Sequence, residues 1–399
     1  MDNLKNIVDQ TIDKAKEELK TISKSIFDHP ELGHEEHYAH DLLSEFLSSK
    51  GFVVDKHYKL HTAFRAVHDG GVGPNLAVLC EYDALSGLGH ACGHNLIAEV
   101  GVATALGVKA ALEKAGKPLG KLTVLGTPAE EGQGGKIDLI HSGAFDGIDC
   151  AMMAHPSQFT WSRPVYVAMN ELSIKFLGKA SHASSAPWDG VNALDAAVQC
   201  YQNISCLRQQ MKPTWRIHGV ITNGGSKPNI IPDVTELLYY VRARAPTDPE
   251  VEQLKLKVVD CVDGAALSTG CKVEYVFSKN GYSSLMSNNV LASLFDENGQ
   301  AIGMKFEQDE IRRRKAGGST DMGNVSHVVP SIHPNFFIGT ASGHTKELAV
   351  TACSESAQEN TLSTAKALSM TMVDIFENPD LLPRIQDEFK LQLEQEKNV

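Results

Sequence analysis

A short segment with two imidazoles and a thiol, Gly89–Asn95, carries side chains that could bind a metal ion. Cys92 and His94 are two residues apart, so in an extended backbone their side chains leave on the same side. Thiolate and imidazole both suit zinc. The alternative is a buried structural cysteine beside ordinary histidines, because cysteine is among the most buried residue types.

Three further groups of this kind lie at or just beyond the ends of apolar runs: Glu130 with Glu131, His155, and His344. Each alone has an ordinary explanation, since a lone histidine is usually structural and paired glutamates often begin a solvated helix. Together with Cys92 and His94 they offer more ligands than one tetrahedral zinc uses, which indicates two ions sharing a water. One glutamate could then bind metal while its neighbour takes the proton of that water.

These groups need a sheet to bring them together. The apolar run 75–80 precedes the Cys92 segment, and similar runs precede Glu130 and His155. Strands that alternate with helices predict an α/β fold with a doubly wound, largely parallel sheet, whose ligands bind at the carboxyl ends of the strands. We assign 1–167 and 281–399 to this catalytic domain.

Between these two parts the pattern of the sequence changes. Residues 171–176 alternate polar and apolar with period two, as in a strand with one solvated face. The following segments have a β-α-β-β-α-β order, which is that of a ferredoxin-like unit. The sequence therefore predicts an inserted α+β domain over 168–280.

Composition excludes several classes of protein. The 399 residues carry a formal net charge of −12, which argues against nucleic acid and against anionic membranes as partners. We find no signal sequence and no run approaching the roughly 18 apolar residues of a membrane helix. Eight scattered cysteines are typical of reduced thiols, so we expect a cytoplasmic protein.

Three apparent motifs were weighed for other chemistry. Residues 132–136 resemble a phosphate loop, but Ile137 stands where Ser or Thr is needed. A serine hydrolase is not indicated, because the chain has no Gly-x-Ser-x-Gly elbow. The basic run 312–315 is either a solvated loop or a site for a substrate carboxylate.

Several segments, in order along nearly the whole chain, resemble the dinuclear metallopeptidases of the aminoacylase and carboxypeptidase G family, in the amidohydrolase branch that uses a cysteine ligand. The segments that carry this resemblance are His29–Leu32, Glu81–Leu85, His90–His94, Pro128–Gly132, Ala154–Pro156, Ser181–Pro187, Pro228–Pro232 and Gly343–Thr345.

The resemblance implies a role for each candidate residue. The implied metal ligands are Cys92, His94, Glu131, His155 and His344, with Glu130 as general base. Glu81 and Asp83, and with them His90 and Asn95, would lie behind the ligands and orient them. His182 would reach across a homodimer to stabilise the tetrahedral intermediate in the partner's site. Asn229 and Arg242 would contact substrate.

The sequence departs from the pattern of that branch at Asn95, where Asp usually follows Cys-Gly-His. Together with Glu81–Leu85 and Gly318–Asn324, this departure resembles the subgroup that contains β-alanyl-lysine dipeptidase and aminobenzoyl-glutamate hydrolase B. The implied cofactors are two divalent ions, zinc before manganese or cobalt.

The expected function is hydrolysis of a dipeptide amide, of the β-alanyl- or γ-aminobutyryl-lysine or -ornithine type. The alternatives are an N-acyl-amino-acid or aminobenzoyl-glutamate amidohydrolase and, in another class, a non-catalytic, metal-stabilised binding protein.

Overall fold

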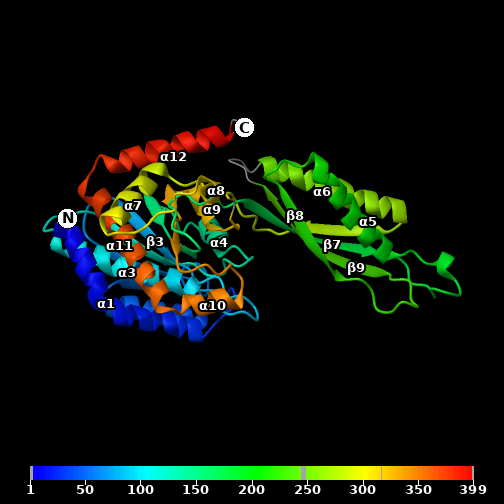
Figure 1. The fold of residues 1–399 in the computed structure, drawn as a ribbon, viewed down its shortest axis with the longest axis horizontal. Helices are drawn as coiled ribbons and strands as arrows, with labels where there is room; N and C mark the ends of the chain where they lie inside the picture. Colours follow the sequence, from blue (N-terminus) through cyan, green and yellow to red (C-terminus); the bar gives the residue numbers. More distant parts are fainter. Residues whose placement is uncertain (1–2, 244–248, 316, 398–399) are drawn as a thin grey trace. The chain divides into compact units, whose positions relative to one another are not determined.

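The computed structural model describes residues 3–243, 249–315 and 317–397. The chain divides into two compact units, each treated by itself below. The first unit runs to Val165 and resumes at Leu285, and the second comprises Tyr166–Ser284 (Figure 1).

The first unit is built on a mixed sheet of six strands, which confirms the predicted α/β class. Its strands lie in the order β1 (Val53–Lys56), β2 (Phe64–Asp69), β4 (Lys121–Gly126), β3 (Asn75–Cys80), β5 (Cys150–Met152) and β11 (Ser331–Ile332). The pairs from β4 to β11 are parallel, and β1 and β2 join antiparallel at the other edge. The ligand-bearing segments after β3, β4 and β5 therefore leave the same edge of the sheet.

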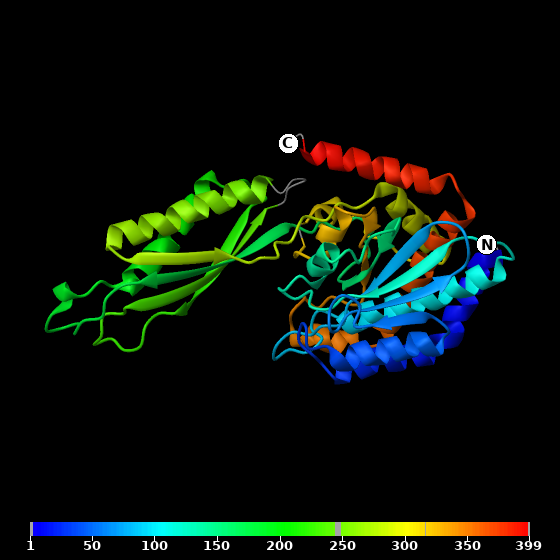
Figure 2. The same ribbon diagram turned by 180° about the vertical axis from the view of Figure 1, so that it is seen from behind.

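Helices cover this sheet (Figure 2). They are α1 (Asn3–Asp28), α2 (His37–Ser49), α3 (His94–Lys114), α4 (Gly135–His141), α7 (Asn289–Ala301), α8 (Glu310–Arg314), α9 (Met322–Ser326), α10 (Lys346–Ala352), α11 (Glu355–Glu377) and α12 (Leu381–Lys397). A short parallel pair, β6 (His155–Ser157) with β12 (Asn335–Phe337), extends the structure beyond β5. The long helix expected from Glu355 is two helices, because Pro379 interrupts it and Asn378 Oδ1 accepts from Asp380 N in the turn between them.

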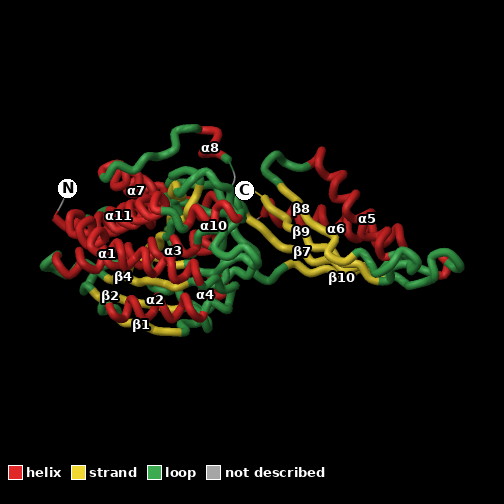
Figure 3. The backbone as a smooth tube through the Cα atoms, turned by 60° about the horizontal axis from the view of Figure 1, so that its bottom comes forward, coloured by secondary structure: helices red, strands yellow, loops and turns green. Residues whose placement is uncertain are grey.

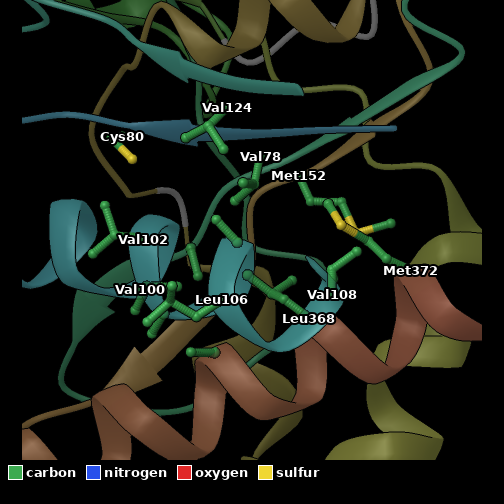
Figure 4. Close-up of a cluster of buried hydrophobic side chains, with 14 of the residues drawn as sticks. Val78, Cys80, Val100, Val102, Leu106, Val108, Val124, Met152, Leu368 and Met372 are labelled. Carbon is green, nitrogen blue, oxygen red and sulfur yellow. The ribbon is translucent and has the colours of Figure 1, made fainter. Parts of the chain in front are cut away.

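Helix α3 is the centre of this unit's core. Its Val100, Val102 and Leu106 lie among side chains of the sheet and of α11, including Val78 and Leu368 (Figure 4). The helix is long and apolar enough to cross a membrane by length and composition, contrary to our expectation, but 89% of its apolar window is buried inside the fold. Packing on all sides accounts for that composition.

The second unit has a four-stranded antiparallel sheet in the order β10 (Lys272–Phe277), β7 (Ala168–Leu177), β9 (Val234–Ala243) and β8 (Arg216–Asn223). Helices α5 (Ala193–Cys206) and α6 (Pro249–Thr269) pack on one face of it (Figure 3). Short 3-10 turns occupy Pro187–Asp189 and Leu207–Gln210. The order β7-α5-β8-β9-α6-β10 is the predicted ferredoxin-like order.

Close packing of α3 on β3 gives a test of this fold. A Cβ at Gly101 would lie 2.3 Å from Cys80 Sγ and 3.1 Å from Leu79 O. We expect Gly101→Ala to lower the free energy of unfolding by about 1–3 kcal/mol through overpacking, although alanine favours a helix. The matched control is Gly264→Ala on the exposed side of α6, where the nearest atom is 3.8 Å away. The control should gain about 0.5–1 kcal/mol. Thermal unfolding compares the two variants, and a Gly101→Ala protein as stable as the wild type would refute the packing described.

Candidate metal centre and active site

His94 is the first residue of α3 and is fully buried. It is helical, so the extended backbone that we assumed for Cys92–His94 is wrong, although the two side chains still converge. His94 Nδ1 donates to Asp83 Oδ1 at 3.0 Å, which leaves Nε2 as the nitrogen with the lone pair. Asp83 Oδ2 accepts from the Glu131 backbone N–H at 2.8 Å. Asp83 thus aligns two of the candidate ligands.

A glycine permits this start of the helix. Gly93 has φ +83°, and a Cβ there would lie 2.6 Å from Pro156 Cγ, next to His155. His155 Nδ1 donates to the Pro156 carbonyl at 2.7 Å, and its Nε2 lies 3.4 Å from Cys92 Sγ. The tight packing of Gly93 on Pro156 therefore brings the α3 start and the β6 segment together.

The segment with the paired glutamates is held by a buried carboxylate. Ala129 has φ +61°, an unfavourable conformation for a residue with a side chain. Its backbone N–H donates to Glu36 Oε1 at 2.7 Å, and Thr62 Oγ1 donates to Glu36 Oε2 at 2.8 Å. Burial, with Asp83 nearby, raises the pKa of Glu36 to about 7. Glu36 thus fixes the backbone just before Glu130.

His344 completes the group from a second strained position, with φ +60°. Its backbone N–H donates to Ala91 O at 2.9 Å, which ties it to the Cys92 segment. Its Nε2 lies 3.6 Å from Glu131 Oε1, and its side chain is 57% exposed. His344 is therefore the solvent-facing member of the cluster.

The predicted ligands come together in three overlapping groups whose ligand atoms lie within 4.8 Å of one another: Cys92, His94 and His155; Cys92, Glu131 and His344; and His94, Glu130 and Glu131. Two of these atoms, His94 Nε2 and Glu131 Oε1, are buried without a hydrogen-bond partner and lie 3.9 Å apart. A buried polar atom left unpaired is costly. Such nitrogen and oxygen donors, with a thiol beside them, fit divalent metal ions.

The electrostatics of the cluster also favour a cation. Burial together with the Glu81 and Glu131 carboxylates holds the pKa of Glu130 well above its usual range. Burial opposes a charged imidazole, yet Cys92 and Asp83 raise the pKa of His94 well above its usual range. Burial raises the pKa of the Cys92 thiol to about 12 and, with His94, lowers that of His155 to about 4. Metal ions would supply the positive charge that protons otherwise provide.

The residues expected to orient the ligands divide into two pairs. Asp83 contacts His94 directly, and Glu81 Oε2 lies 3.8 Å from His94 Nε2. His90 and Asn95 are buried but bond to α1 instead, His90 Nε2 to Ile26 O at 3.1 Å and Asn95 Nδ2 to Ser23 Oγ at 3.0 Å. A neutral amide suits that place, since Asn95 donates a proton to the Ser23 hydroxyl.

The remaining candidates belong to the second unit. The His182 segment pairs with that of Asn229, whose carbonyl accepts from Ala183 N at 3.1 Å. His182 Nδ1 is 3.3 Å from the backbone N atoms of Ser184 and Ser185. Arg242 lies on β9, with its guanidinium 5.5 Å from the Tyr240 ring centre. Their roles toward substrate stay predictions.

Sequence reasoning missed three buried residues behind the cluster: Glu36, Lys136 and Asp321. Lys136 was set aside with a phosphate-loop likeness, and Asp321 was noted only within a longer segment. A lysine just after paired glutamates was the available signal, because charged residues are seldom fully buried unless paired.

The contact of Gly93 with Pro156 predicts a coupled loss of stability and metal binding. We expect Gly93→Ala to strain φ by about 1–2 kcal/mol and to push Pro156 and His155 away from Cys92. Gly116→Ala is the matched control, because Gly116 has φ +68° and no atom within 4 Å of its added Cβ. Thermal unfolding should show losses in both variants, while titration with a chelator should show weaker metal binding in Gly93→Ala alone. Equal chelator curves would count against the role assigned to Gly93.

Comparison with known proteins places this geometry in a family. The family model for peptidase family M20/M25/M40 matches residues 78–371. The chain is 51% identical to the Xaa-Arg dipeptidase of Mus musculus, over 98% of this chain and 94% of the relative. It is 29% identical to the B-type component of the p-aminobenzoyl-glutamate hydrolase of Escherichia coli K12, over 97% of this chain and 95% of that relative.

Among solved structures, the fold is similar to that of the Bacillus subtilis YXEP protein, described as a dinuclear metal binding peptidase from the M20 family. The TM-score is 0.70 at 18% identity, over 92% of this chain and 99% of the other. The alternative of a non-catalytic binding protein is therefore set aside. The chain belongs to peptidase family M20/M25/M40 and is a hydrolase acting on peptide bonds.

Proposed function

We propose that this protein is a dimetal dipeptidase that hydrolyses the amide bond preceding a basic amino acid. The observation that carries the proposal is the convergence of five metal-binding side chains beside the Glu130 carboxylate. The ligands are Cys92, His94, Glu131, His155 and His344. Zinc is the preferred ion, since thiolate and imidazole ligands suit it, with manganese and cobalt as alternatives.

Glu130 is the general base of the proposed mechanism. Two bound divalent ions would polarise the substrate carbonyl and lower the pKa of a shared water. The raised pKa of Glu130 suits a carboxylate that takes a proton from water and later releases it to the leaving amine. Asp83 supports this step by holding both His94 and the Glu131 backbone in place.

His182 is proposed to complete the site of a partner subunit in a homodimer. Two backbone N atoms lie near Nδ1 on its own loop, so Nε2 is the nitrogen left to donate to a substrate oxygen. A donor aimed at the carbonyl oxygen would stabilise the negative charge that develops there. Asn229, whose segment pairs with the His182 segment, and Arg242 are proposed to contact the substrate.

The proposed leaving group is lysine, ornithine or arginine, with β-alanyl or γ-aminobutyryl as the preferred acyl part. Support comes from the relative named Xaa-Arg dipeptidase and from the net charge of −12, which would attract a cationic substrate. The runner-up substrate is aminobenzoyl-glutamate, the named substrate of a 29% identical relative. The basic run gives that alternative little help, because Arg312 pairs with Glu307 at 3.2 Å and Arg313 with Glu310 at 2.9 Å.

The proposed compartment is the cytoplasm. All eight cysteines are free thiols. Several of them are buried, and a reducing environment would keep exposed thiols such as Cys206 unpaired.

A substrate panel tests the proposed function directly. The purified, metal-replete protein is assayed with β-alanyl-lysine, γ-aminobutyryl-lysine, β-alanyl-arginine, β-alanyl-histidine, acetyl-amino acids and aminobenzoyl-glutamate, each with and without a chelator. We expect kcat/KM for the lysine and arginine dipeptides to exceed that for the acetyl compounds by at least about tenfold, which corresponds to about 1.4 kcal/mol of binding to the cationic side chain. Chelator should abolish the activity. Release of glutamate alone would favour the runner-up, and chelator-resistant turnover would refute the metal mechanism.

Two variants test the base and the shared site together. We expect Glu130→Ala to keep its metal ions, because Glu131 remains, and to lose about 10²–10⁴-fold in kcat. His182→Ala should also be nearly inactive. When the two proteins are mixed under conditions that exchange subunits, about half of the dimers are mixed and one of their two sites is intact, so about a quarter of wild-type activity should return. No recovery despite proven exchange would rule out the shared site.

A further inference from the structure

Lys136 is a fully buried lysine directly behind the ligand cluster. It is the second residue of α4, close after Glu131 in the chain. Its Nζ contacts Glu81 Oε1 and donates to Asp321 Oδ1 at 2.8 Å, while its backbone N–H donates to Asp321 Oδ2 at 2.9 Å. Lys136 therefore links the end of β3, the start of α4 and the residue that precedes α9.

This triad is an expensive way to stabilise a core. Taking an ammonium out of water costs several kcal/mol, and a buried ion pair is often no more stable than apolar residues of the same volume. Burial opposes the charge, but Asp321, Glu81 and Glu130 raise the pKa of Lys136, so it stays an ammonium. What the triad holds in place is therefore more informative than its contribution to stability.

Glu81 is held in a particular way. Its Oε1 is engaged by Lys136, whereas its Oε2 is buried without a hydrogen-bond partner. That oxygen lies 3.8 Å from His94 Nε2, which is also buried and unpaired. A carboxylate with one oxygen tied down can rotate little, so the contact with Lys136 decides where the second oxygen points.

We propose that Lys136 is a positioning residue of the active site. Its ammonium and backbone N–H, anchored by the two oxygens of Asp321, hold Glu81 so that Oε2 faces His94 and the metal-binding cluster. Lys136 touches neither substrate nor the predicted ligands and acts through Glu81. The expected effect on catalysis rests on the proposed dimetal function, whereas the expected effect on metal geometry does not.

Lys136→Met removes the ammonium and nearly keeps the volume. We expect kcat on the best dipeptide of the panel to fall about 10–100-fold, as is usual when a residue that orients metal ligands is lost. KM should change little, because no substrate contact is removed. In the cobalt-substituted protein, the visible absorption bands should shift, since they report the geometry around the ion. The matched control is Lys109→Met on α3, which removes the lysine of a surface pair with Glu113 and should alter neither kcat nor the bands.

A second substitution separates positioning from simple ion pairing. Asp321→Asn, added to Lys136→Met, removes a buried acid left without its cation, so the Tm should recover in part. Neither kcat nor the cobalt bands should recover, because Glu81 still lacks Lys136. Joint recovery of Tm, kcat and bands would overturn the proposal, as would wild-type kcat and bands in Lys136→Met.

Glu81→Gln keeps the test decisive if Lys136→Met does not fold. The amide retains an oxygen for Lys136 but replaces or displaces the oxygen that faces His94, so the cobalt bands should shift. Unchanged bands and kcat in Glu81→Gln would also overturn the proposal. A wild-type protein that binds cobalt but cleaves no compound of the panel would refute the proposed function alone, and the spectral comparison would still decide the role of Lys136.

Discussion

Glu81, Asp83, Glu130 and Glu131 lie together at the carboxyl ends of β3 and β4, largely out of reach of water. Carboxylates cannot share such a place without positive charge, because their mutual repulsion adds to the cost of leaving water. His94 and Lys136 answer part of this demand with short contacts to Asp83 and Glu81. The rest is left for metal ions, and the unpaired atoms of His94 and Glu131 are where ions fit.

The backbone around these charges is held against its local preferences. Ala129 and His344 both have positive φ, and Gly93 can adopt its conformation against Pro156 only because it has no side chain. Hydrogen bonds from Ala129 to Glu36 and from His344 to Ala91 hold the strained positions. Strain of this kind persists only where the surroundings over-determine it. The rigid core formed by α3 and the parallel strands provides that support.

The two units divide the work differently. The first unit contains every predicted metal ligand, on segments that leave one edge of its sheet. The second unit carries His182 and Asn229 on paired segments at one end of an antiparallel sheet. A peptidase of this design would gain from a separate unit, since a donor for the carbonyl oxygen is needed only when substrate is present.

The sequence by itself determined the fold class, the β-α-β-β-α-β order of the second unit and the ligand set that the structure gathers. Periodicity encodes strands and helices locally, and chemically reactive side chains placed after apolar runs must meet at one edge of a parallel sheet. Only the tertiary structure decided that His94 begins a helix, that Gly93 packs on Pro156, and that Glu36 and Lys136 are buried beside the site. The bond from Lys136 to Asp321 joins residues 185 apart, and that from Ala129 to Glu36 joins residues 93 apart. Such pairings leave no periodic trace in the sequence, because they depend on how distant elements pack and not on the conformation of either segment alone.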